Sequence, residues 1–153
     1  MGNAVQSEGP VENSFSGHGL NINGIIFLSP KDALPFLEAD AILVDLREGL
    51  ERNGREFKVN NVILMPHRSF KDEFGSLPKD RSLILACCVG LESRDAVRLL
   101  MAHGYTSVAS LNGGMIAWEQ DGAPTVIDRG EELAGGCACQ LRPRKVYGRR
   151  AGC

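Results

Sequence analysis

The sequence predicts an α/β domain whose mostly parallel sheet of about five strands is flanked by helices. Three observations predict it. The chain has 153 residues, which suits one domain with a sizeable core. Short runs rich in Ile, Leu and Val recur along it, separated by longer amphipathic stretches. These runs are apolar at consecutive positions, which is typical of strands buried on both faces of a parallel sheet.

Five apolar runs predict the strands. They are "GIIFL" (24–28), "AILVDL" (41–46), "NVILM" (61–65), "SLILA" (82–86) and "SVASL" (107–111). Parallel strands need crossover connections, and these are right-handed in nearly all known cases. We therefore expect helices between the runs, on both faces of the sheet.

Three stretches predict helices. Ser29-Pro30 precedes "KDALPFLEA" (31–39), in which Pro35 shortens or kinks the helix. Ser93 begins "SRDAVRLLMAHG" (93–104), with Gly104 ending it. A last helix, "MIAWEQDG" (115–122), follows two glycines.

The chain divides into three parts by composition. Residues 1–22 are rich in Gly, Ser and Asn and predict a flexible N-terminal arm, whereas 23–127 carry the domain. Residues 128–153 predict a Cys-containing basic C-terminal tail, because they are too poor in apolar residues to continue a core. The first twenty residues hold no continuous apolar run, so neither a signal peptide nor a membrane span is expected, and a cytoplasmic location is the simplest inference.

Charge and cysteine content narrow the function classes. A net charge of -2 argues against nucleic acid or an anionic membrane as the main partner. The five cysteines are odd in number and fit no even disulfide framework, which indicates free thiols in a reducing compartment.

Cys87 directly follows the fourth predicted strand. In open α/β sheets, sites form outside the carboxyl ends of the strands. The residues after Cys87 must curl from strand end to helix start, directing N–H groups inward, and the helix adds its positive dipole end. We expect an anion-binding loop that stabilises a thiolate, a persulfide or an oxyanion. It consists of Cys88, Val89, Gly90, Leu91, Glu92 and Ser93. The alternative is that Cys87 is simply a small buried apolar residue.

The stretch "CCVGLESRDAVRLLMAHGYTSVASLNGGMIAWEQDGAP" (87–124) closely resembles the C-terminal half of a rhodanese-like domain. The matching positions are Cys87, Gly90, Ser93, Gly104, Gly113, Gly114, Trp118, Gly122 and Pro124. The N-terminal half agrees more loosely. "ILVDLRE" (42–48) looks like the family's strand ending in Asp-x-Arg-Glu, but the usual Gly-His-Ile-Pro turn is absent.

The resemblance implies a rhodanese-like three-layer fold and a sulfurtransferase. Cys87 would be the nucleophile that takes sulfane sulfur from thiosulfate or a persulfide donor, forms a persulfide, and passes the sulfur to a thiol, cyanide or protein acceptor. No metal and no organic cofactor is expected, because the loop supplies electrostatic stabilisation and the cysteine supplies the covalent intermediate.

Two alternatives remain open. The chain could be a non-catalytic, regulatory rhodanese module that binds a partner through its active-site face and basic tail. Alternatively, Cys88 and Arg94 form a Cys-x5-Arg pattern, which resembles the signature of cysteine phosphatases and arsenate reductases, where the Arg clamps an oxyanion.

Several further residues are candidates for the site. Asp45, Arg47 and His67 follow predicted strands on the same edge as Cys87, and they are candidates for the pocket. The alternative for Asp45 and Arg47 is a structural ion pair. Glu92 stands where the family often has Arg, and a carboxylate there would repel thiosulfate, so weak thiosulfate activity or a persulfide donor is expected. The alternative is a solvated Glu92 side chain that points away from the loop. Cys137 and Cys139 are candidates for a sulfur relay from Cys87.

Overall fold

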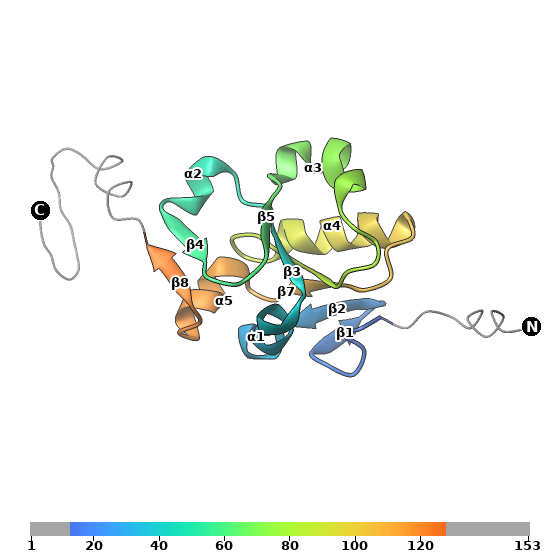
Figure 1. Ribbon diagram of the computed structural model, residues 1–153, viewed down its shortest axis with the longest axis horizontal. Coiled ribbons are helices and arrows are strands. Elements are labelled where there is room, and N and C mark those ends of the chain that lie inside the picture. The colour runs from blue at the N-terminus through green and yellow to red at the C-terminus, as the bar shows by residue number, and fades with distance from the viewer. Residues whose placement is uncertain (1–12, 128–153) are drawn as a thin grey trace, which may run out of the picture.

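The computed structural model describes residues 13–127, which form an α/β domain (Figure 1). A six-stranded sheet has the order β1-β2-β7-β6-β3-β5. Its strands are β1 (Leu20–Ile22), β2 (Ile25–Leu28), β7 (Val108–Leu111), β6 (Leu83–Ala86), β3 (Ile42–Asp45) and β5 (Val62–Leu64). All neighbours are parallel except β1 and β2, which pair antiparallel at one edge. The mostly parallel sheet predicted from the sequence is confirmed.

The five predicted strands are all present, each within one residue of its predicted ends. A separate two-stranded antiparallel sheet joins β4 (Arg55–Phe57) to β8 (Thr125–Ile127), with Arg55 opposite Ile127. The sequence did not predict β1, β4 and β8, because each has only three residues and so shows no periodicity.

The three predicted helices are also present, as α1 (Pro30–Ala39), α4 (Leu91–Ala102) and α5 (Gly114–Gln120). The hydroxyl of Ser29 accepts the backbone N–H of Asp32 and caps α1, which contains Pro35. Three short helices were not predicted: α2 (Gly49–Arg52), α3 (His67–Glu73) and a 3₁₀ turn over Phe74–Ser76. They have too few residues to show an amphipathic pattern.

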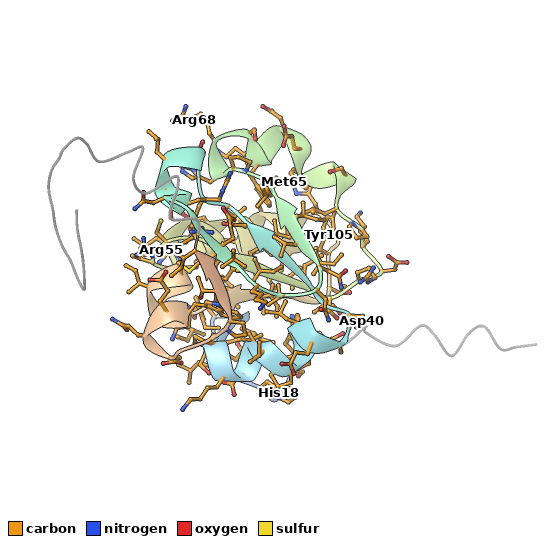
Figure 2. The ribbon with its side chains drawn as sticks, turned by 60° about the vertical axis from the view of Figure 1, so that its left-hand side comes forward. His18, Asp40, Arg55, Met65, Arg68 and Tyr105 are labelled. Atoms are coloured by element: carbon orange, nitrogen blue, oxygen red, sulfur yellow. The ribbon has the colours of Figure 1, made fainter. Side chains whose placement is uncertain are left out.

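Helices cover both faces of the sheet and give the domain its layers (Figures 1 and 2). Along β3, Ile42 and Val44 face a core that includes Phe70 of α3 and Leu100 of α4. The intervening Leu43 faces the opposite core, in which side chains of α1 and α5 pack. This alternation within a continuously apolar strand is what burial on both faces requires.

Part of the predicted N-terminal arm belongs to the folded domain. Phe15 is fully buried and makes an edge-to-face ring contact with Phe36, while the Asn13 side chain donates to the carbonyl of Val108. The arm predicted over 1–22 is therefore corrected for residues 13–22. A single buried aromatic in a Gly- and Ser-rich stretch carries no periodic signal. Residues 1–12 and the predicted tail over 128–153 lie outside the described residues.

Across residues 13–127, none of the helices has the length and apolar character that a membrane-spanning helix needs.

Candidate active site

Cys87 follows β6, a central strand that lies between β7 and β3. Because these strands are parallel, their carboxyl ends meet at one edge of the sheet, which brings Asp45, His67, Cys87 and Gly113 to that edge. The Cys87 side chain is only 1% exposed.

The loop after Cys87 curls around its sulfur. The backbone N–H of Gly90 donates to the Cys87 Sγ over 2.9 Å. Gly90 adopts the left-handed conformation with φ of 103°, which favours glycine, and it is the N-cap residue of α4. No side chain caps this helix end, so the N–H groups of its first turn have no side-chain acceptor. Together with the helix dipole, they favour a negative charge there.

Two buried serines lie beneath the sulfur. The Cys87 Sγ lies 3.7 Å from the Ser93 Oγ, and that oxygen is 2.7 Å from the Ser110 Oγ. The Ser93 hydroxyl is also 3.2 Å from the carbonyl oxygen of Gly90, which it reaches as a donor. Both serines are fully buried. The hydroxyls thus connect Cys87, the loop and strand β7.

Helix α5 holds the other side of the loop. The N–H of Met115 donates to the Cys87 carbonyl over 2.9 Å, and that of Ile116 donates to the Cys88 carbonyl over 3.2 Å. This close approach requires glycine at position 114. A Cβ there would overlap the carbonyl oxygen of Cys87 and lie 2.6 Å from the carbonyl carbon of Cys88. The Gly113-Gly114 turn therefore fixes the shape of the loop.

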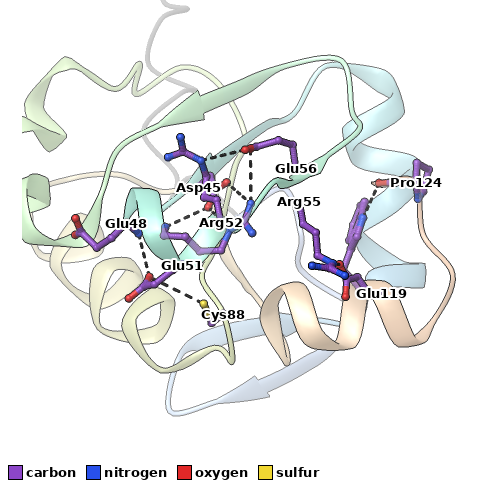
Figure 3. A network of polar contacts seen from close by, with 11 residues as sticks. Asp45, Glu48, Glu51, Arg52, Arg55, Glu56, Cys88, Glu119 and Pro124 are labelled. Carbon is purple, nitrogen blue, oxygen red and sulfur yellow. Dashed lines mark hydrogen bonds and ion pairs between the residues drawn. The ribbon is translucent and has the colours of Figure 1, made fainter. Parts of the chain in front are cut away.

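Cys88 points toward a different element than Cys87 does. It is half-buried, and its Sγ lies 4.0 Å from a carboxylate oxygen of Glu51 in α2 (Figure 3). Burial raises the pKa of the Cys88 thiol, and the Glu51 charge raises it further, while Arg47 acts in the opposite direction. Cys88 is thus held as a neutral thiol.

Asp45 and Arg47 form a buried ion pair at the end of β3. Two parallel hydrogen bonds join them, Nε to Oδ1 at 2.9 Å and Nη2 to Oδ2 at 2.8 Å (Figure 3). Arg47 also lies 3.8 Å from a carboxylate oxygen of Glu56 and stacks over the Phe57 ring. The pair therefore ties the β3–α2 connection to β4.

His67 begins α3, and its ring faces two carboxylates on the rim of the loop. The Nε2 lies 3.6 Å from Glu48 and 3.8 Å from Glu51. Glu92 is half-buried. It lies in the first turn of α4, because that helix begins at Leu91, two residues before the predicted start at Ser93. His67 and Glu92 share the lining of a groove of about 500 Å³ between α3 and α4.

Arg94 lies in α4, with its Nε 3.3 Å from the Asp95 carboxylate. In residues 13–127, no group of three or more His, Cys, Asp or Glu side chains is arranged to hold a metal ion. Cys137 and Cys139, the candidate relay cysteines, lie outside the described residues.

Sequence reasoning did not identify Ser110 or Glu51 as part of this site. The signal for Ser110 was available, since it is the one buried polar residue of the apolar run "SVASL". Glu51 gave no such signal, because α2 is a single turn with no periodic pattern.

Cys87 is thus a buried cysteine at the carboxyl edge of the sheet, in a loop that leads into a helix without a side-chain cap. A family comparison matches residues 29–121 to the rhodanese-like domain. The chain therefore belongs to the rhodanese-like domain family.

Relatives of known name agree with this assignment. A sulfurtransferase of Allochromatium vinosum is 33% identical over 91 residues, covering 60% of this chain and 83% of that protein. The thiosulfate sulfurtransferase GlpE of Shewanella oneidensis is 28% identical over 97 residues, covering 63% and 94%. A rhodanese-related protein of Thermoplasma volcanium has a similar fold, with a TM-score of 0.60 at 24% identity over 66% of this chain and 97% of that one.

Proposed function

We propose that this protein is a rhodanese-type sulfurtransferase that carries sulfane sulfur as a persulfide on Cys87. The observation that supports this most is the hydrogen bond from the Gly90 N–H to the Cys87 Sγ, in a loop that ends at the uncapped start of α4. These groups stabilise negative charge at the sulfur. The names of the two relatives, sulfurtransferase and thiosulfate sulfurtransferase, support the same activity.

The reaction has two displacement steps. The Cys87 thiolate attacks the sulfane sulfur of a donor, and a new S–S bond forms while the donor's own bond to that sulfur breaks. With thiosulfate, sulfite leaves with the electron pair and Cys87 becomes a persulfide anion. A nucleophile such as cyanide then attacks the outer sulfur, giving thiocyanate and the Cys87 thiolate again. The loop amides from Cys88 to Ser93 stabilise the charge in both steps.

The charges around the loop favour a persulfide donor over thiosulfate. Glu51 lies beside Cys88, and Glu92 lies in the first turn of α4. The carboxylates of Glu48 and Glu51 both lie near the His67 ring. Thiosulfate carries two negative charges, and carboxylates at the rim repel it. A neutral or singly charged persulfide meets less repulsion.

The contacts of Cys88 and Arg94 do not favour the phosphatase or arsenate reductase alternative. The Cys88 sulfur faces the Glu51 carboxylate, which disfavours a thiolate, and Arg94 pairs with Asp95. The non-catalytic module is a separate alternative, and an unreactive Cys87 in a folded protein would identify it.

Mass spectrometry tests the proposal directly. The protein is incubated with thiosulfate and, separately, with an alkyl persulfide, and Cys87→Ser is compared with Cys88→Ser. We expect one added sulfur atom that is lost only in Cys87→Ser and that cyanide removes. Absence of added sulfur with both donors would favour the non-catalytic module, whereas dependence on Cys88 and Arg94 would favour the oxyanion-binding enzyme.

A further inference from the structure

The described chain ends beside the rim of the active site. Its last strand, β8, places Ile127 opposite Arg55 of β4. Arg55 follows α2 closely, since that helix ends at Arg52, and Glu51 of α2 contacts Cys88. Arg55 is four positions after Glu51 in the sequence, a span of at most about 14 Å. In Figure 1, β8 lies alongside β4, which follows α2 in the chain.

The rim near this chain end carries unbalanced negative charge. The carboxylates of Glu48, the N-cap of α2, and of Glu51 in α2 face the His67 ring, which is neutral unless protonated. The nearby arginines are already paired, Arg47 with Asp45 and Arg52 with Glu56 (Figure 3). Both carboxylates accept backbone N–H groups, Glu48 from Arg68 and Glu51 from Glu48, but they keep their negative charge. A positively charged segment would therefore be attracted here.

The segments that surround Cys88 also expose large aliphatic side chains. These are Leu50 of α2 at 95% exposed, Leu91 at 58%, Ile116 of α5 at 50% and Val89 at 48%. Exposed aliphatic residues gathered around a site are typical of a surface that another polypeptide covers. Apolar side chains and carboxylates together fit a peptide that is basic and partly apolar.

The same chain contains such a peptide. After Glu132 there is no acidic residue, while Arg142, Arg144, Lys145, Arg149 and Arg150 follow two cysteines, Cys137 and Cys139. We propose that the segment 137–145 binds across this rim in its own molecule, and that Cys137 or Cys139 accepts the sulfur carried by Cys87. This inference rests on the proposed function and adds the acceptor to it.

The chain is long enough for this contact. Cys137 is ten residues beyond Ile127 in the sequence, and ten residues span at most about 33–36 Å. A domain of this size has a radius of gyration of about 13 Å. The segment therefore reaches the loop of Cys87 from β8 without unfolding the domain.

The transfer needs no oxidant or reductant. The thiolate of the tail cysteine attacks the outer sulfur of the Cys87 persulfide and forms a new S–S bond. The bond between the two sulfurs of the Cys87 persulfide breaks, and its electron pair stays on the Cys87 Sγ. The products are a persulfide on the tail and the Cys87 thiolate, so the charge is unchanged.

The test follows the sulfur through the full-length protein. The protein is loaded with less than one equivalent of an alkyl persulfide, quenched by alkylation at a series of times, and mapped by peptide mass spectrometry. We expect the added sulfur on the Cys87 peptide first and on the Cys137–Cys139 peptide later. We expect the same transfer rate after tenfold dilution of the protein, because the acceptor belongs to the same molecule.

Matched variants test the docking surface. Glu48→Gln combined with Glu51→Gln is expected to slow the transfer step at least about threefold at low salt, and much less at high salt. Replacing Arg142, Arg144 and Lys145 by Gln is expected to do the same. Glu73→Gln, an exposed carboxylate of α3, serves as the control and should not change the rate.

Three outcomes would overturn the inference. Sulfur on the tail in Cys87→Ser would mean that the tail is loaded directly. Sulfur that stays on Cys87 would leave the proposed function intact and exclude the tail as acceptor, and a rate that rises with protein concentration would assign the acceptor to a second copy. If Cys87 takes no sulfur from any donor, the proposed function fails, and this inference fails with it.

Discussion

The backbone N–H of Gly90 donates to the Cys87 Sγ over 2.9 Å, so the residue that begins α4 is joined directly to the candidate nucleophile. The contact depends on the left-handed conformation of Gly90, which other residues adopt only at a cost of roughly 1–2 kcal/mol. The loop is therefore shaped around the sulfur before any substrate arrives, which is what electrostatic stabilisation of a charged intermediate requires.

Ser93 should contribute to both stability and sulfur transfer. In Ser93→Ala, the buried hydroxyl of Ser110 loses its 2.7 Å partner, and we expect a loss of about 1–3 kcal/mol in the free energy of unfolding. We expect sulfur transfer to fall about tenfold, equivalent to about 1.4 kcal/mol, because the Cys87 Sγ also loses a hydroxyl contact. Urea denaturation and initial rates measure the two effects.

A double-mutant cycle provides the control for Ser93. If the two hydroxyls act as a pair, Ser93→Ala with Ser110→Ala costs less stability than the sum of the single changes. Additive losses would mean that the two hydroxyls contribute independently.

Gly114→Ala should displace the loop of Cys87. The added methyl group would overlap the Cys87 carbonyl oxygen, and Gly114 has a φ of 58°. We expect a loss of more than about 2 kcal/mol in stability, since the left-handed conformation alone costs roughly 1–2 kcal/mol, together with a large loss of activity. Gly122→Ala is the matched control, because Gly122 has a φ of 74° and nothing within 4 Å of its added Cβ. Equal effects of the two changes would argue against the close approach to the loop.

Glu92→Arg should raise turnover with thiosulfate. Glu92 is half-buried in the first turn of α4, and its replacement removes a repulsive charge near the loop and adds an attractive one. At a separation of about 4 Å, a pair of unit charges interacts with about 1 kcal/mol in water and more near a protein surface, so a rise of about three- to tenfold is expected. Turnover with an alkyl persulfide, which carries at most one negative charge, should change less. Glu73→Arg, on α3, controls for net charge, and an unchanged thiosulfate rate in Glu92→Arg would remove the repulsion argument.

Sequence reasoning predicted the parts of the fold that have a pattern of their own. Five strands of consecutive apolar residues and three longer helices were found, because burial on both faces and helical spacing leave a signal over several residues. The short β4 and β8 depend on pairing with each other across about seventy positions of sequence, and no local pattern records that contact. The burial of Phe15 was not predicted for a similar reason, because it is a single aromatic residue without periodic apolar neighbours.

The same limit applied to the candidate site. The placement of Cys87 at the carboxyl edge follows from the apolar run before it, and the glycines mark the turns around it. The neighbours that come from distant segments did not follow from local sequence. Ser110 reaches Ser93 from β7, and Glu51 reaches Cys88 from a single-turn helix. Both contacts exist only once the strands are arranged in the sheet.

Cys88 should need a higher pH than an ordinary cysteine does to react with alkylating agents. Burial and the Glu51 carboxylate raise the pKa of its thiol, so the reactive thiolate forms later as the pH rises. In a Cys87→Ser background, the pH dependence of Cys88 alkylation is measured by peptide mass spectrometry. Glu51→Gln keeps an acceptor oxygen for the N–H of Glu48 but removes the charge, and it should shift the profile to lower pH. An unchanged profile would attribute the shift to burial alone.

Tyr105 should make the stability of the domain fall at high pH. Its hydroxyl donates to the carbonyls of Leu77 at 2.7 Å and Phe74 at 3.0 Å, and burial raises the pKa of the phenol. The folded protein favours the neutral phenol, and this preference contributes to the free energy of unfolding. The contribution is complete below the pKa of the unfolded state, about 10, and is lost as the pH rises through the higher pKa of the folded state. Tyr105→Phe should cost about 1–3 kcal/mol at neutral pH through the lost hydrogen bonds. Urea denaturation from pH 7 to 11 measures the free energy of unfolding of the wild type and of Tyr105→Phe, and the difference between the two values should shrink above about pH 10. A constant difference would mean that the pKa of the phenol is the same in the folded and unfolded protein.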